Sequence, residues 1–399
     1  MKARYSFSVL LILLVGVSHA SMAACDQTLS VGANVASAVA NAASGTTICL
    51  NNGNYGKVEF FNISRSNYVT VQSTSGRGAT IATHPGNAQY IRFQNLTIPG
   101  GVSNSCSRHL QWINNTFTGV VTLTNSGCSN LDILFDGNTF DGISVGGGYE
   151  GRLSVVYGCP SGVTIRNNQF GNGGASDGVQ VLGGACNVQI GPGNTFAGIQ
   201  QSRCGSVHCD AIQFYGAGAN NVIEGNYFKN GDTFIMMPDG SNSVAVRNNV
   251  FDGSGASYEY KLQFGSARNL MFEHNTVFNA SIAIDSKTGE TASSDAIVRN
   301  NIITGYSQFK TTGGSGCSNC AFSFNLFDDS GTARGSTTIV GAPTYVGGGT
   351  NPSTWSGFQL TAASLGFKAA SDGNDRGSTA FGGAQVAAIP EPPSNVVAQ

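Results

Sequence analysis

Charge and long hydrophobic runs are scarce in this chain of 399 residues. Charged residues make up 11% of it, and 20 Lys and Arg stand against 22 Asp and Glu. Nucleic acids and anionic membrane surfaces attract a basic excess, so the near-neutral balance predicts neither as a partner. After residue 24, no apolar run reaches the roughly 18 residues that a membrane-spanning helix needs. We therefore expect a soluble monomer once the N-terminal segment is removed.

The N-terminal segment has the order of a signal peptide. Two cations in "MKAR" precede an apolar core from Phe7 to Val17, and small residues follow from Ala20 to Ala24. This order predicts export, to the periplasm or the extracellular space. Lipidation of Cys25 is an alternative, but it would leave nine cysteines, an odd number. A Cys25–Cys49 disulfide is therefore favoured.

Glycine, in contrast, is abundant, and an asparagine repeat runs through the middle of the chain. The 55 Gly, with many Asn, Ser and Thr, favour short strands and tight turns over helices. Each repeat of about 25 residues has an alternating apolar segment, an Asn and a further apolar residue, as in "VTIRNNQF" (163–170). The aligned asparagines are Asn115, Asn138, Asn168, Asn194, Asn226, Asn249, Asn275 and Asn301, with Asn325 as a candidate ninth. Period-two alternation in so short a repeat predicts a parallel β-solenoid.

An Asn at the same corner of every coil can bond the Asn of the next coil and tolerates left-handed backbone. This pattern resembles the right-handed parallel β-helix proteins of the pectate-lyase-like superfamily, whose asparagine ladder lies at the turn between two of three sheets. The resemblance covers about residues 90–330 and implies an all-β fold. The "WIDH" and "RxPxxR" signatures of the main pectate lyases and the "GHG" and "RIK" runs of polygalacturonases are absent.

A domain organisation follows from the repeat. Apolar and small residues at Val35, Ala38, Val39 and Ala42 predict one short helix that caps the open end of the solenoid. The expected parts are a signal peptide (1–24), an N-terminal cap with the first coils (25–90), the parallel β-helix (91–330), a C-terminal coil or cap (331–388) and a flexible tail (389–399).

All 10 cysteines lie at or after residue 25, which predicts five disulfides in an oxidising compartment. Four of these cysteines fall at the same place in successive coils. The predicted pairs are Cys25–Cys49, Cys106–Cys128, Cys159–Cys186, Cys204–Cys209 and Cys317–Cys320. The alternative for "CSNC" (317–320), a redox or zinc half-site, lacks a second cysteine pair.

Charged residues of alternating sign occur two places before the ladder asparagines of four coils. They are Glu224, Arg247, Glu273 and Arg299, and they predict outward cross-strand ion pairs.

A second strand follows the ladder corner in each coil. In segments such as "DGVQV" (177–181), "DAIQF" (210–214) and "DTFIM" (232–236), the third and fifth residues are apolar and should face the core. The outward columns are then Arg152, Gly178, Ala211, Thr233, Lys261 and Ser281, and Ser154, Gln180, Gln213, Ile235, Gln263 and Ala283. Small residues with Gln, Lys and Arg standing among them suit a polysaccharide chain, walled by loops 141–150 and 197–209. The resemblance to the β-helix polysaccharide lyases implies a cleft on the same sheet.

Asp177, Asp210 and Asp232 each begin one of these strands in consecutive coils. Stacked carboxylates repel one another, so such a site must bind a cation, raise a pKa or use the side chains as caps for backbone N–H groups. Three interpretations stay open, namely strand-entry caps, a Ca²⁺ site and a catalytic carboxylate. Ca²⁺ is the one candidate cofactor.

His208 and Lys261 are the remaining candidates for proton transfer. His208 lies in a loop that a Cys204–Cys209 bridge would close, beside Asp210, and either acts as acid or base or makes one local hydrogen bond. Lys261 loosely resembles the lysine base of the alginate and dermatan lyase family, and its alternative is a solvated surface side chain. If His208, Asp210 and Lys261 do not converge with Gln213 and Tyr215 on one groove, the enzyme hypothesis weakens sharply.

The sequence therefore predicts a secreted protein that acts on an acidic, uronic-acid-containing polysaccharide, as a lyase or a C5-epimerase. One group neutralises the substrate carboxylate, a base removes the C5 proton and an acid assists the leaving group. The candidate catalytic residues are His208, Asp210 and Lys261, the candidate substrate-binding residues are Arg152, Gln180, Gln213, Tyr215 and Gln263, and the candidate Ca²⁺ ligands are Asp177, Asp210 and Asp232. A non-catalytic polysaccharide binder or adhesin and a glycoside hydrolase with paired Asp residues are the alternatives.

Overall fold

The computed structural model describes most of the chain between residues 24 and 382. The described ranges are 24–124, 132–145, 151–156, 159, 162–205, 208–240, 242–254, 261–285, 291–304, 317–330, 333–349 and 352–382. The predicted cleavage region before residue 24, Cys128 and the predicted tail (389–399) lie outside them.

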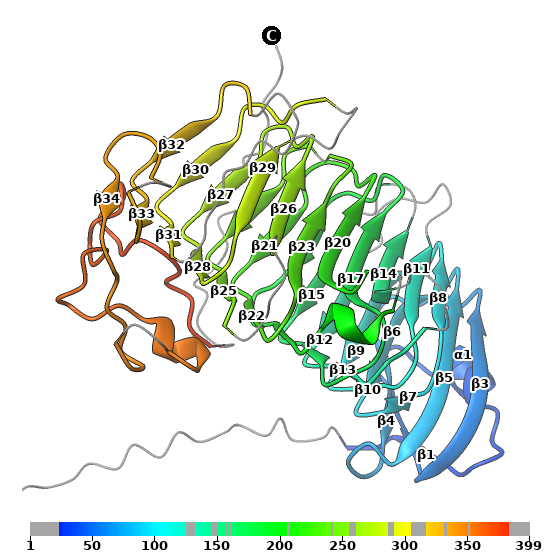
Figure 1. Cartoon of the computed structure of the whole chain (residues 1–399). Helices are drawn as coiled ribbons and strands as arrows, with labels where there is room; N and C mark the ends of the chain where they lie inside the picture. Colours follow the sequence, from blue (N-terminus) through cyan, green and yellow to red (C-terminus); the bar gives the residue numbers. More distant parts are fainter. Residues whose placement is uncertain are drawn as a thin grey trace, which may run out of the picture.

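The chain winds into a parallel β-helix whose strands stack coil upon coil (Figure 1). Three stacks result, and every named strand pairing in them is parallel. The first stack, on the N-terminal side of the ladder corner, consists of β1 (Gln27–Leu29), β2 (Thr47–Leu50), β4 (Val69–Ser73), β6 (Gln89–Gln94), β9 (Arg108–Ile113), β12 (Ile133–Asp136), β15 (Val163–Arg166), β18 (Val188–Ile190), β21 (Val222–Glu224), β24 (Ala245–Arg247), β27 (Met271–Glu273), β30 (Ile297–Arg299) and β32 (Ala321–Ser323).

The second stack follows the ladder corner and the third comes after the next turn. The second comprises β7 (Thr97–Ile98), β10 (Thr116–Phe117), β13 (Thr139–Asp141), β16 (Gln169–Gly171), β19 (Thr195–Ala197), β22 (Tyr227–Lys229), β25 (Val250–Asp252), β28 (Thr276–Phe278), β31 (Ile302–Ile303), β33 (Leu326–Phe327) and β34 (Ile339–Val340). The third comprises β3 (Gly53–Phe61), β5 (Ala79–Gly86), β8 (Val102–Ser105), β11 (Val121–Thr124), β14 (Gly151–Val156), β17 (Asp177–Leu182), β20 (Asp210–Tyr215), β23 (Thr233–Met237), β26 (Leu262–Gly265) and β29 (Ile282–Asp285). β5 pairs with both β7 and β8 and so joins the two stacks.

The short capping helix is confirmed as α1 (Val35–Asn41). Asn34 caps its N-terminus, because the Asn34 side chain accepts a hydrogen bond from the N–H of Ser37 at 2.9 Å. Val35 and Val39 are buried against the core of the first coils. Two 3₁₀ turns, η1 (Gln201–Arg203) and η2 (Trp355–Phe358), complete the described helical segments. None of the described helices is long and apolar enough to cross a membrane.

The asparagine ladder is confirmed, and Asn325 is its ninth rung. Each Nδ2 group donates to the Oδ1 atom of the next rung at 2.9 to 3.3 Å. The same Nδ2 groups also donate to buried backbone carbonyls, as Asn226 does to Ile190 at 2.9 Å. Since a buried amide without partners is costly, the rungs hold the coils in register. Two residues beyond six of these rungs, inward phenylalanines stack between coils with ring centroids 4.5 to 4.9 Å apart.

The predicted cross-links agree with this register. Disulfides join Cys25 to Cys49, Cys159 to Cys186, Cys204 to Cys209 and Cys317 to Cys320. Cys106 is also disulfide-bonded. Such bonds form in oxidising compartments, as expected for an exported protein. The charged column forms the ion pairs Arg247–Glu224 at 3.0 Å and Arg299–Glu273 at 2.8 Å.

The segment after residue 333 folds back along the outer side of the second stack, where it is drawn in orange and red (Figure 1). Arg376 Nη1 donates to the carbonyl of Asn325 at 2.6 Å, and Ser378 Oγ donates to that of Asn248 at 2.8 Å. Between the segment and the strands lies a buried cluster, here called the apolar seam. Its members are Tyr227, Val250, Phe278, Ile302 and Leu326 from the strands, and Tyr345, Phe358 and Leu360 from the segment.

Candidate functional site

The side of the third stack away from the core carries a column of polar side chains, here called the polar face. Ser154, Gln180 and Gln213 lie in register on β14, β17 and β20. Ser154 Oγ donates to Gln180 Oε1 at 3.2 Å, and Gln180 Nε2 donates to Gln213 Oε1 at 2.9 Å. On the next coils Met236 and Gln263 continue the column. The polar column that the alignment predicts is therefore present, but Ser154 and Gln180 are buried, at 4% and 1% exposed, so the expectation that they face solvent is wrong. Gln213 is partly buried, and the use of the column in binding stays a prediction.

Two carboxylates, here called the carboxylate pair, adjoin this column on consecutive coils. Asp177 Oδ1 accepts a hydrogen bond from the backbone N–H of Asp210 at 2.7 Å, and its Oδ2 accepts one from Gln180 Nε2 at 2.7 Å. Asp210 is fully buried, and neither of its carboxylate oxygens meets a donor with good hydrogen-bond geometry among the described residues. The neighbouring polar side chain is that of Thr233, in register on β23.

Burial sets the charge state of the carboxylate pair. Loss of hydration raises the pKa of Asp177 from 3.8 to about 6, although hydrogen bonds from Asp210 and Gln180 and the nearby His208 and Arg152 act in the opposite direction. Burial, and then the negative charge of Asp177, raise the pKa of Asp210 well above its usual value, against a weaker effect of Thr233. Two close carboxyl groups that are shielded from water favour a state in which they hold a proton.

Asp232 is not part of this pair. Asp210 lies opposite Thr233, so the predicted alignment of "DAIQF" with "DTFIM" is wrong by one residue. The cause is the continuous apolar run of β23, which has no period-two alternation to set its register. Asp232 Oδ2 instead accepts a hydrogen bond from the N–H of Gln201 at 2.7 Å and so caps η1.

The predicted Ca²⁺ site from these three aspartates therefore does not assemble. Asp177 and Asp232 each cap a backbone N–H group, as the strand-entry interpretation expects. In the described part of the chain, no group of three His, Cys, Asp or Glu side chains is placed to hold a metal ion.

Arg152 and Lys261 do not stand in solvent, so their predicted orientation is wrong. Their exposed fractions are 0% and 2%. The regular pairing of β14 with β17 omits Arg152 and Gly178, and a side chain at Gly178 would meet Phe196 and Ile199. The predicted column that contains Arg152, Gly178 and Lys261 therefore turns toward the corner between the second and third stacks. The prediction assumed that side chains alternate regularly between core and solvent along the whole strand, and at these first strand residues they do not.

Both cations are only partly compensated. Arg152 Nη2 donates to the carbonyl of Gly173 at 2.5 Å, whereas its Nε and Nη1 atoms have no hydrogen-bond partner among the described residues. Burial lowers the pKa of Arg152 to about 10, against the favourable charges of Asp141 and Asp177. Lys261 Nζ donates to the carbonyl of Gly231 at 3.3 Å, and burial lowers its pKa against the charges of Asp232 and Asp252.

His208 and Tyr215 are the exposed candidates. The loop that the Cys204–Cys209 disulfide closes, here called the bridged loop, holds His208 close enough to Asp177 for their charges to interact. Tyr215 lies at the end of β20 and is 59% exposed. Cys209 N–H donates to Gln201 Oε1 at 3.1 Å, so η1 and the bridged loop support one another. His208, the carboxylate pair and the Gln180–Gln213 link thus gather on β17 and β20, whereas Lys261 lies beside Asp232 beyond β23. Thr233, predicted only as an outward residue, is the polar neighbour of Asp210 that correct register would have identified.

Comparison with known proteins finds the same architecture at low identity. A point mutant of the PL6 family alginate lyase AlyGC aligns with a TM-score of 0.53 and 14% identity, over 91% of this chain and 59% of that chain. This chain has the parallel β-helix fold. The PL6 family polysaccharide lyase Pedsa3628 from Pseudopedobacter saltans aligns with a TM-score of 0.44 and 12% identity, over 84% of this chain and 99% of that one. PfbA, a surface adhesin of Streptococcus pneumoniae, aligns with a TM-score of 0.36 and 13% identity over 69% and 82%. No protein-family model and no curated protein matches.

Proposed function

We propose that the protein acts on an acidic, uronic-acid-containing polysaccharide at the polar face, as a secreted lyase or C5-epimerase. The observation that carries this proposal is the buried carboxylate pair, whose pKa values burial raises and which lies beside a hydrogen-bonded Ser and Gln column and within electrostatic reach of an exposed histidine. The fold shared with an alginate lyase supports the substrate class.

The two reactions share their first step, removal of the C5 proton of a uronate. His208, an exposed titratable group whose charge interacts with Asp177, is the candidate base or acid, and Gln213 and Tyr215 offer hydrogen bonds to sugar hydroxyls. Asp177 holds a hydrogen bond to Gln180 and thereby orients the column. Asp210 and Lys261 are further catalytic candidates, since burial favours the neutral form of both side chains.

A non-catalytic binder is the second candidate function. The caps that Asp177 and Asp232 provide favour it, because a carboxylate that holds backbone N–H groups is committed to structure. We do not propose the hydrolase. Asp177 and Asp210 are linked to each other on adjacent strands, whereas a hydrolase needs two carboxylates on opposite sides of the scissile bond.

The experiment is a substrate screen of the mature protein on alginate, pectate, glucuronan and glycosaminoglycans, with and without EDTA. A lyase generates the ultraviolet absorbance of an unsaturated uronate, and an epimerase changes the proton NMR spectrum of the polymer without cleavage. Retention on the polymer without either change identifies a binder. Failure of all three readouts on every polymer contradicts the proposal.

Variants locate the chemistry within the polar face. If His208 is the base or acid, His208→Ala reduces turnover by about 10²- to 10⁴-fold. Lys261→Met is the competing test, since the same loss there transfers the role to Lys261. His109→Ala is the matched control, because His109 lies on the first stack and pairs with Asp132 at 2.8 Å.

A further inference from the structure

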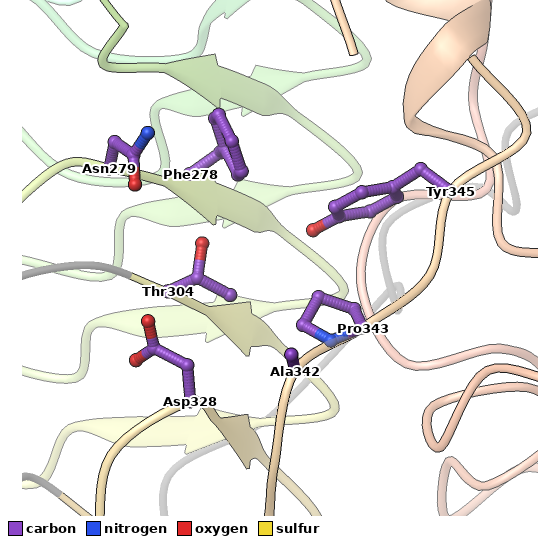
Figure 2. A pocket seen from close by; sticks show the side chains of 7 residues that line it. All are labelled: Phe278, Asn279, Thr304, Asp328, Ala342, Pro343 and Tyr345. Carbon is purple, nitrogen blue, oxygen red and sulfur yellow. The ribbon is translucent and has the colours of Figure 1, made fainter. Parts of the chain in front are cut away.

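A cavity of about 370 Å³ lies at the end of the apolar seam, where the C-terminal segment crosses the last coils. Phe278, Thr304 and Asp328 line one side, at the ends of β28, β31 and β33. Pro343 and Tyr345 of the C-terminal segment line the opposite side, and Figure 2 shows the Tyr345 hydroxyl facing the strands. Its volume is within the range of sites for small molecules, about 300 to 1,000 Å³.

Two buried hydroxyl groups at this cavity have no hydrogen-bond partner among the described residues, those of Thr304 and Tyr345. The residues are 4% and 2% exposed. A buried hydroxyl without a partner costs free energy, so native structures rarely leave two on one cavity unless something else satisfies them. The pair therefore indicates a ligand that presents its own hydroxyl groups.

The cavity is built on fixed elements. Tyr345 exchanges backbone hydrogen bonds with Gly349 at 2.7 and 3.2 Å. Its ring packs edge-to-face on Phe278 and Phe358, with centroids 6.1 and 5.4 Å apart. Thr304 N–H donates to the carbonyl of Val277 at 2.8 Å. The two hydroxyls are thus held in place before a ligand arrives, which lowers the entropic cost of binding.

Charge decides the class of ligand. Asp328 is exposed at the edge of the cavity, and with burial its negative charge raises the pKa of the Tyr345 hydroxyl, which therefore stays protonated. The same charge disfavours an anion in the cavity. Asn279 adds an amide at the rim. Hydroxyl, amide and carboxylate groups around aromatic rings suit a neutral, hydroxyl-rich ring.

We propose that this cavity binds one neutral saccharide unit. The site lies on the second stack, outside the polar face, and its ligand differs in charge from the uronate polymer proposed there. The inference does not rest on the proposed function, so the two fail independently.

The test is ligand-observed NMR of the whole mature protein with methyl glycosides of glucose, galactose and mannose. Glucuronate and glucosamine serve as the anionic and cationic counterparts. We expect saturation transfer to at least one neutral glycoside and none to glucuronate. Signal from glucuronate or glucosamine in the absence of a neutral glycoside, or from no probe at all, overturns the proposal.

Isosteric variants then assign the signal to the cavity. Thr304→Val and Tyr345→Phe should each weaken binding by about fivefold, the loss that one hydrogen bond of about 1 kcal/mol gives. Both should keep or raise the melting temperature, because each removes a buried hydroxyl without a protein partner. Thr361→Val is the matched control, since Thr361 also has a buried hydroxyl without a partner among the described residues but does not line the cavity. Unchanged affinity in both test variants, or equal weakening in the control, contradicts the assignment.

Discussion

The second and third stacks arise from the same repeat but present different side chains away from the core. On the second stack, Tyr227, Val250 and Phe278 point outward, and the C-terminal segment covers them. On the third, Ser154, Gln180 and Gln213 occupy the outward column and bond to one another from coil to coil. Apolar side chains are therefore buried on one outer side, whereas on the other Ser154 and Gln180 are buried polar groups that are hydrogen-bonded to each other.

This difference between the two stacks shows that folding of the repeat constrains the inward-facing residues and leaves the outward-facing ones free to vary. Inward residues are apolar in both stacks, because every coil must fill the same interior. Outward residues carry no such constraint, so one surface became an internal interface and the other a row of polar groups beside buried charges. A large uncovered apolar patch would invite association, which the C-terminal segment prevents.

The largest expected loss of stability comes from a substitution beneath the C-terminal segment that covers the second stack. Phe358 is 1% exposed and packs on Phe278 and Tyr345, with ring centroids 5.4 Å away in both contacts. Phe358→Ala should lower the free energy of unfolding by about 3 to 5 kcal/mol. Denaturant titration measures it. Tyr215→Ala, at an exposed position of the third stack, should change stability by less than about 0.5 kcal/mol, and comparable losses would mean that the two outer sides are not different.

The next effect comes from the carboxylate pair and depends on pH. The pKa of Asp177 is about 6 in the folded chain against 3.8 without its environment. The folded chain therefore holds a proton that the unfolded chain has released, and stability should fall by about 3 kcal/mol as pH rises from about 4 to above 6. Denaturant titration across this range measures it.

Asp177→Asn is the control for this slope. Carboxylates with lowered pKa, such as Asp372, make stability rise with pH instead. The quantity to compare is therefore the difference in the free energy of unfolding between the parent protein and Asp177→Asn at each pH. That difference should disappear below pH 4. A constant difference at every pH would show that Asp177 is not a buried acid.

Removing the second carboxylate should help the fold. In the folded chain Asp210 must either hold a proton or bury a charge beside Asp177, and both are unfavourable at pH 8. Asp210→Asn removes this cost, and we expect a gain of about 1 to 2 kcal/mol at pH 8, seen as a higher melting temperature. If the same variant loses activity on a polymer cleaved by the parent, the residue is retained for chemistry at a cost in stability. A destabilised variant would instead indicate that Asp210 is structural.

The smallest expected loss of stability comes from breaking a side-chain hydrogen bond between coils in the polar column. Gln213→Ala removes the acceptor of Gln180 Nε2 and should cost about 0.5 to 1.5 kcal/mol. Gln263→Ala is the matched control, because Gln263 lies between Met236 and Ala283, which offer no strong hydrogen bond. Equal costs in the two variants would show that the side-chain bonds between coils add nothing.

The fold could be predicted from spacing because a solenoid repeats its interior. The asparagines and the inward phenylalanines recur at coil intervals, as do the cysteines of the Cys25–Cys49 and Cys159–Cys186 pairs, and the structure places them on adjacent coils. The site was harder to predict. The run "TFIMM" (233–237) gave no register, so Asp232 was aligned with Asp210 in place of Thr233. Arg152 and Lys261 were taken as exposed because regular alternation was assumed up to the first residues of their strands.

The sequence by itself determined the coil, its ladder and the disulfides between coils, since these depend on contacts between equivalent positions in neighbouring repeats. Tertiary structure alone decided which outward positions meet water. The cover over Tyr227 and Phe278 comes from a segment without the repeat, and the burial of Asp210, Arg152 and Lys261 depends on loops and corners that differ from coil to coil. Burial sets the pKa of these groups, and burial is a property of neighbours distant in sequence.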